Sequence, residues 1–211
     1  MADLASVASF ATAGGTLVLA VATFYSVRSA NRAARTAERA LQIGLRPLLM
    51  PSRLDDPPEK LMWADRHWAQ VVGGRASVEA LDGTVYLAMS LRNVGSGIAV
   101  LHGWYVWPEW QSSEPAHAPG ADFRTLSRDQ YVPPGDVSFF QAAIREPDDP
   151  ALEAMTDVVK NREIFTVDLL YSDHDGGQRT ISRFTVSPRE EGSEWLIGVT
   201  RHWNLDRPDP R

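Results

Sequence analysis

Alternating hydrophobic and polar residues run through the C-terminal three quarters of the chain and are clearest between residues 84 and 93. Apolar side chains occupy every second position there: Val85, Leu87, Met89 and Leu91. This period is typical of a half-buried β-strand. Asp82-Gly83 directly precedes the segment and is typical of a hairpin turn, so residues 77–81 are expected to pair with it.

A second hairpin pattern joins residues 164–172 to residues 179–186 through the turn sequence Asp173-His174-Asp175-Gly176-Gly177. Alternation places four side chains on the buried faces of these two hairpins: Leu87, Leu91, Val167 and Leu169. It places Tyr86 and Asp168 on outward faces, where substitution should cost little.

The remaining pattern also predicts strands, at residues 98–107, 137–144 and 194–203. One short helix is expected after an Asp149 cap followed by Pro150. Short strands separated by turns favour a mainly β domain over residues 48–205, built as an antiparallel sandwich with one short helix. Residues 206–211 contain two prolines and are expected to form a disordered tail.

The N-terminal pattern is different, because residues 4–27 carry no charge. As a helix they would extend about 36 Å, enough to cross a hydrocarbon core of about 30 Å. A secretory signal peptide has its positive charge before the apolar stretch, whereas here Asp3 precedes it and arginines follow. Residues 1–27 are therefore expected to be a single-pass transmembrane anchor, with the N-terminus outside and the C-terminal domain in the cytoplasm.

A basic juxtamembrane helix is expected over residues 28–47 and should end at Pro47. Four arginines recur on one face: Arg28, Arg32, Arg35 and Arg39. They could contact anionic lipid headgroups. Small residues on another face form a weak heptad seam that could make the chain a homo-oligomer, and a solvated stalk is the remaining alternative.

Four short motifs carry a family resemblance: "RPLL" at residues 46–49, "LRNVGSGIA" at 91–99, "VPPGD" at 132–136 and "LLYSDHDGGQR" at 169–179. Together with the N-terminal helix, they resemble a group of uncharacterised actinobacterial single-pass membrane proteins. The "RNVGSG" stretch also resembles strand and turn elements of immunoglobulin-like modules in bacterial proteins. The resemblance implies an immunoglobulin-like cytoplasmic domain, and it implies no catalytic activity, because these motifs are turn sequences.

Composition and charge narrow the function further. The chain has 211 residues, a net charge of −6 and no cysteine, which excludes disulfides and thiolate metal sites. Residues 48–211 hold 25 acidic and 16 basic side chains. Such a surface repels phosphate backbones, so nucleic acid is not an expected partner.

Candidate catalytic chemistry is sparse. Asp173 and Asp175 lie in the closest grouping of carboxylates and histidine, where they could share a cation, but aspartate and glycine are also what a hairpin turn requires. The five histidines show no metal-binding spacing, and no serine lies in a nucleophile motif. No catalytic residue, metal ligand or cofactor site is therefore expected, and the chain is not expected to be an enzyme.

An aromatic cluster is the strongest binding candidate: Trp104, Tyr105, Trp107 and Trp110. On a strand, these side chains divide between two faces, so one face needs a cover or a partner. Trp63 and Trp68 could cover it from within the chain. The prediction is a membrane-anchored cytoplasmic protein-interaction module. The alternatives are a structural membrane subunit that oligomerises through its helices, or a metal-dependent enzyme.

Overall fold

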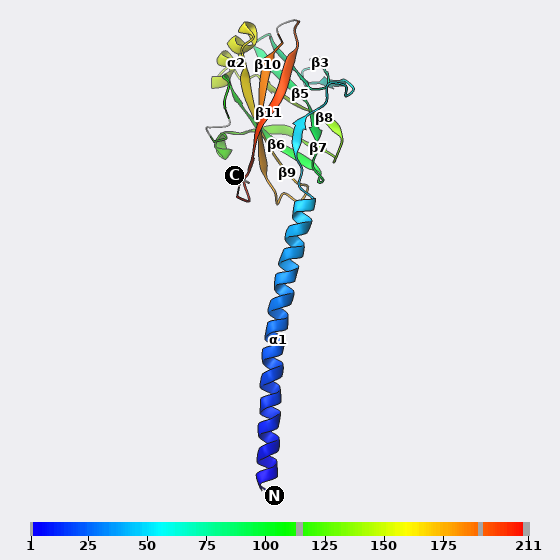
Figure 1. The fold of residues 1–211 in the computed structure, drawn as a ribbon. Helices are drawn as coiled ribbons and strands as arrows, with labels where there is room; N and C mark the ends of the chain where they lie inside the picture. Colours follow the sequence, from blue (N-terminus) through cyan, green and yellow to red (C-terminus); the bar gives the residue numbers. More distant parts are fainter. Residues whose placement is uncertain (1, 113–115, 190–191, 209–211) are drawn as a thin grey trace. The chain divides into compact units, whose positions relative to one another are not determined.

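The computed structural model describes residues 2–112, 116–189 and 192–208; within its first helix, the side chains of residues 2–12, 39, 42 and 43 are not described (Figure 1). The chain divides into two units, residues 1–44 and residues 45–211. Each unit is considered by itself below.

The first unit is helix α1, which spans Ala2–Gly44. Its described side chains are all exposed, including large apolar ones: Leu17, Val18, Leu19, Val21, Phe24, Tyr25, Val27 and Leu41. Among the residues searched, which are the described ones, no helix is both long enough and apolar enough to cross a membrane. Part of the predicted anchor, up to residue 12, lies outside the described side chains.

The second unit contains eleven strands and helix α2 (Pro150–Asn161) among its described residues. The strands are β1 (Leu49–Pro51), β2 (Glu59–Met62), β3 (Trp68–Val71), β4 (Arg75–Leu81), β5 (Thr84–Asn93), β6 (Ala99–Trp107), β7 (Arg124–Val132), β8 (Val137–Ile144), β9 (Phe165–Ser172), β10 (Thr180–Pro188) and β11 (Trp195–Asn204). A short 3₁₀ helix, Gly120–Asp122, precedes β7.

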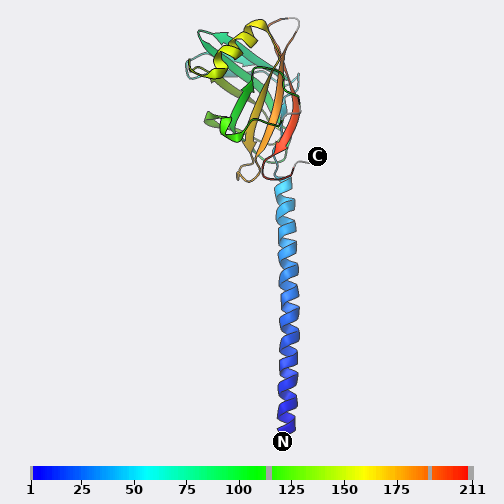
Figure 2. The same ribbon diagram turned by 90° about the vertical axis from the view of Figure 1, so that its left-hand side faces the viewer.

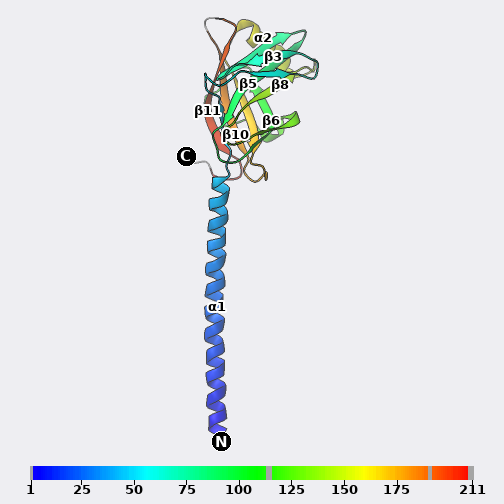
Figure 3. The same ribbon diagram turned by 90° about the vertical axis from the view of Figure 1, so that its right-hand side faces the viewer.

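Nine of these strands form one curled antiparallel sheet (Figures 1 and 3). The hydrogen-bonded order is β1-β5-β4-β11-β10-β9-β6-β7, and β8 pairs with β5. Strands β2 and β3 form a separate hairpin. The predicted hairpins are found as β4–β5 and β9–β10. The mainly β, antiparallel class predicted from the alternation is therefore confirmed.

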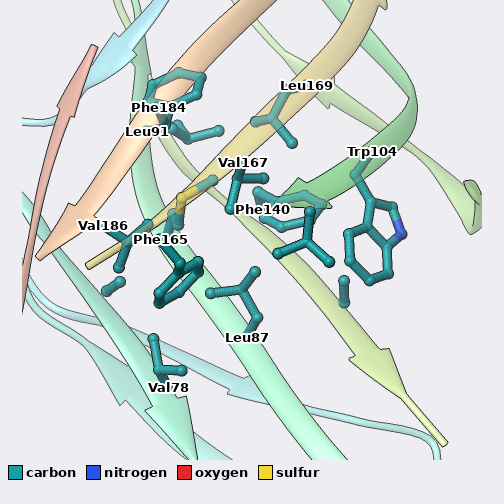
Figure 4. Close-up of a cluster of buried hydrophobic side chains, with 14 of the residues drawn as sticks. Val78, Leu87, Leu91, Trp104, Phe140, Phe165, Val167, Leu169, Phe184 and Val186 are labelled. Carbon is teal, nitrogen blue, oxygen red and sulfur yellow. The ribbon is translucent and has the colours of Figure 1, made fainter. Parts of the chain in front are cut away.

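The main core fills the inside of the curl (Figure 4). Leu87, Leu91, Val167 and Leu169 are all at most 3% exposed, which confirms their predicted burial. Helix α2 covers one end of the curl, where its Met155 side chain is buried (Figure 2). The helix begins as predicted, because the Asp149 side chain accepts the Ala151 N–H.

The prediction that Tyr86 and Asp168 face outward into solvent is wrong. Tyr86 is 8% exposed because the β2–β3 hairpin packs on the outer face of β5, with Trp63 at 5.1 Å between ring centroids. Asp168 is fully buried beneath the segment that follows β6. Both strands are thus covered on two faces, and alternation alone identifies only one of them.

Asn93 organises the turn between β7 and β8. Its side-chain amide donates to the carbonyls of Val132 (2.9 Å) and Gly97 (2.6 Å), and its side-chain oxygen accepts the N–H of Leu48 (3.1 Å). Its backbone carbonyl accepts the Gly135 N–H at 2.8 Å. The turn is therefore held by β5 and by the start of the domain.

Candidate functional site

Strands β7 and β8 follow one another in the chain, yet among the described pairings they have different neighbours. β7 pairs with β6, and β8 pairs with β5. Hydrogen-bonded neighbours can be followed from β7 through β6, β9, β10, β11, β4 and β5 to β8. β7 and β8 are therefore the two end strands of this path. The curl is therefore open along one line, with a strand edge on each side.

A groove occupies this opening. A hollow of about 440 Å³ is lined by residues 124–127 of β7, by residues 141–144 of β8 and by Trp63 and Trp104. It adjoins a second hollow of about 680 Å³ at the start of α2. Arg124, Glu146 and Asp149 line both, so the two form one groove. We refer to it as the β7–β8 groove.

Arg124 crosses the middle of the groove. Its guanidinium contacts the Asp149 carboxylate at 2.7 and 3.2 Å and lies 5.0 Å from the Trp104 ring centroid. Burial raises the pKa of Asp149, but the hydrogen bonds from Arg124 and the Ala151 N–H outweigh it and hold this pKa below its usual value. The Asp149 carboxylate is therefore charged at neutral pH.

The β8 wall of the groove is reinforced from outside the sheet. The Trp63 indole N–H donates to the Ala142 carbonyl at 3.0 Å. Asp65 accepts from the Tyr86 hydroxyl at 2.7 Å and from Arg145 at 3.0 Å. The Tyr86 hydrogen bond is the largest cause that lowers the pKa of Asp65 to about 2. These hydrogen bonds tie β8 and the residue after it to the segment between β2 and β3.

The far end of the groove is acidic. The side chains of Asp122, Glu146 and Asp148 line the larger hollow and are exposed. None of the three forms an ion pair with another described residue. Tyr105 lies in the same hollow. The groove therefore combines an aromatic floor with unpaired negative charge.

The predicted aromatic cluster divides between separate places. Trp104 forms the groove floor, and Tyr105 lines the larger hollow. Trp107 points elsewhere and donates its indole N–H to Asp168 at 3.1 Å. Trp110 is 58% exposed. Trp63 lines the same hollow as Trp104, whereas Trp68 is 62% exposed on β3.

Asp168 and Arg183 form a buried ion pair that alternation did not predict. Both side chains are fully buried, and the guanidinium contacts both carboxylate oxygens at 2.8 Å. Arg183 also donates to the Ser112 carbonyl at 2.9 Å, and Asp168 accepts the Ala118 N–H at 3.3 Å. The pair holds Ser112 and Ala118 to the sheet. Its signal in the sequence is two opposite charges at directly paired positions of the β9–β10 hairpin.

The Asp173–Gly177 segment is a satisfied turn. One Asp173 carboxylate oxygen accepts the N–H groups of Gly177 (2.8 Å) and Gln178 (3.2 Å), and the other accepts the Gln178 side chain at 3.1 Å. Gly176 has a φ of 72°, which favours glycine. No group of three possible metal ligands occurs among the residues searched, which are the described ones.

Two serine–histidine contacts exist, but neither presents a nucleophile. His102 lies 2.7 Å from Ser172 and His202 lies 2.6 Å from Ser182. Both serines are buried, at 1% and 0% exposure. A substrate carbonyl could not reach either hydroxyl without opening the sheet.

The predicted basic residues Arg28, Arg32 and Arg35 are exposed on α1, and the side chain of Arg39 lies outside the described ones. Comparison of the whole chain with protein-family models, with curated proteins and with solved structures finds no match.

Proposed function

We propose that this protein is a membrane-anchored protein-interaction module whose partner binds in the β7–β8 groove. The observation that carries the proposal is the opening in an otherwise continuous sheet. Two strand edges flank a concave surface there, and backbone groups at strand edges are ready partners for another chain. Catalysis forms no part of the proposal, because the candidate nucleophiles are buried.

The anchor is assigned to residues 4–27, which lack charges. The described apolar side chains of α1 between Leu17 and Val27 are exposed on all sides, and an apolar environment such as lipid would cover them. The arginines at positions 28, 32, 35 and 39 favour a cytoplasmic location for the domain. The lipid bilayer would then confine encounters with the partner to the membrane surface.

The domain is proposed to be an immunoglobulin-like antiparallel β-sandwich that presents a recognition surface. Its antiparallel strands and its core between facing parts of one curled sheet support this proposal. The alternative is a structural subunit that oligomerises through α1. The exposed apolar side chains of α1 favour that alternative, because a second copy could cover them as well as lipid.

The test compares two arginine substitutions in the full-length, tagged chain. Thr125 is exposed and lines the groove, so Thr125→Arg adds bulk inside it. Thr200 is equally an exposed strand residue but lies on β11, outside the groove lining, so Thr200→Arg is the matched control.

Both variants and the parent chain are purified from detergent extracts of the native cells. We expect one partner protein in stoichiometric amount with the parent chain and with Thr200→Arg, and its loss with Thr125→Arg. Equal recovery with both variants would place binding elsewhere. Recovery of only the chain itself would favour the structural subunit.

A further inference from the structure

We infer that the partner enters the β7–β8 groove as an extended, basic segment that adds a strand between β7 and β8. This inference rests on the proposed function and names the chemistry of the partner at the same site.

The backbone of β8 supports strand addition. The side chains of Phe140, Ala142 and Ile144 all point into the core, and alternate residues of a strand direct their backbone polar groups to the same edge. The Asn93 N–H donates to the Asp136 carbonyl, so the odd-numbered residues of β5 direct their backbone groups toward β8. Leu87 lies directly opposite Ala142, so the backbone groups of Phe140, Ala142 and Ile144 point to β5. The free edge of β8 therefore carries the backbone groups of Gln141 and Ala143.

The geometry of the groove favours an extended ligand. Its walls are the facing parts of two strands, residues 124–127 and residues 141–144, and both strands form ends of the same sheet. A strand that joined either edge would continue the existing ladder, which is how main-chain hydrogen bonds supply affinity in β-augmentation.

The floor of the groove argues against an apolar anchor. Trp104 is only 4% exposed, and Arg124 lies over its ring. The ring therefore offers a ligand little surface, and the proposed affinity comes from backbone pairing with the strand edges and from the charge of the rim. Binding of this kind is weakened by salt.

The acidic side chains at the edge of the groove favour a positively charged ligand. Asp122, Glu146 and Asp148 carry negative charge without a described counter-ion, whereas Asp149 and Asp65 already pair with arginines. Lysine or arginine side chains on the added strand would supply the missing positive charge. Alternate residues of that strand point the same way, so basic residues two apart would face the rim together.

The probe is a displayed library of random decapeptides, selected on the full-length chain in neutral detergent. We expect the selected peptides to carry net positive charge with lysine or arginine at alternate positions. The tightest peptide is then synthesised in two forms, one of them methylated on the backbone nitrogens at alternate residues. Methylation keeps the side-chain charges but removes the strand's hydrogen-bond donors, and should weaken binding about tenfold or more.

Matched variants locate the site. Glu146→Lys combined with Asp148→Lys should weaken the peptide about tenfold, since two attractions become repulsions. Asp129→Lys is the control on β7, because Asp129 is exposed but does not line the groove, and it should change the affinity by less than about twofold.

Selected peptides without positive charge, or no selected peptide at all, would overturn the inference. So would a methylated peptide that binds equally well, or binding that ignores the double charge reversal. If peptides fail in these ways while Thr125→Arg still abolishes capture of the native partner, the proposed function stands and only its strand-addition chemistry is refuted.

Discussion

Removing the carboxylate of Asp168 tests whether the buried Asp168–Arg183 ion pair stabilises the domain. Asp168→Ala deletes the acceptor of three groups: the Arg183 guanidinium, the Trp107 indole N–H and the Ala118 N–H. It removes the Asp168 carboxylate from a guanidinium that is 0% exposed. Removing one partner of an exposed ion pair at the same strand positions would lower the free energy of unfolding only slightly.

The expected loss follows from burial. Breaking a buried ion pair by removing one partner costs about 3–5 kcal/mol, because an uncompensated charge remains in the interior. For a domain of this size, each kcal/mol shifts the melting temperature by about 2–4 °C, so the midpoint should fall by about 6–20 °C. Arg183 can still donate to the Ser112 carbonyl, which favours the lower half of that range.

Urea denaturation of the full-length chain, followed by tryptophan fluorescence, measures the loss. Asp129→Ala is the exposed control and should stay within about 0.5 kcal/mol of the parent. Asp168→Leu combined with Arg183→Met should recover most of the stability, because apolar residues can replace a buried pair. A loss below about 1 kcal/mol for Asp168→Ala would refute a stabilising role for this pair.

Three further predictions concern a close backbone approach at Gly97, the titration of His202 and the orientation of the chain in the membrane. Gly97→Ala should destabilise the domain by about 3 kcal/mol or more in the same urea assay, since its new Cβ would lie 1.7 Å from the Leu45 carbonyl oxygen. Gly120→Ala, where no atom lies within 4 Å, should be nearly neutral. Burial and the charge of Arg46 lower the pKa of His202 below 6.5, so the unfolded chain binds this proton first and stability should fall as pH drops below about 6.5. Thermal melts at pH 8 and pH 5 should show a smaller drop for His202→Gln. A reporter that is active only outside the cytoplasm, fused to the C-terminus, should be inactive, and activity would reverse the proposed orientation.

Hydrophobic alternation predicted the inner faces of the strands because those faces obey a local rule. Leu87 and Val167 lie in one core, and every second residue of an inward-facing strand has to be apolar. The prediction that the outer faces are exposed was wrong at Tyr86 and Asp168, because segments distant in the sequence cover them. Tyr86 is covered by the β2–β3 hairpin, and Asp168 lies beneath described residues after β6 that include Ala118. Neither cover has a strong pattern of its own.

The turn motifs were recognised as turns, but their shared purpose was not visible. Asn93 belongs to "RNVGSG", yet it bonds to Leu48 of "RPLL", 45 residues away, and to Val132 of "VPPGD", 39 residues away. Gly95 is needed there because a Cβ would meet the Arg46 carbonyl oxygen at 2.3 Å. A single buried amide thus explains why these motifs contain asparagine and glycine, and it assigns them to the start of the domain rather than to a binding site.

The groove could not be predicted from the sequence, because it exists only where β7 and β8 do not pair with each other. Residues 124–132 and 137–144 surround a Pro-Pro-Gly turn, a pattern that on local grounds predicts a hairpin. In the structure, Asn93 holds that turn and β5 takes β8 as its neighbour, so the two strands separate beyond the turn. Two members of the predicted aromatic cluster, Trp104 and Tyr105, line the proposed groove. Trp104 and Trp107 belong to one strand, but their side chains point to opposite faces of it. Trp104 lines the groove, whereas Trp107 lies beneath the segment that follows β6. The sequence of the strand does not show which of its faces is covered.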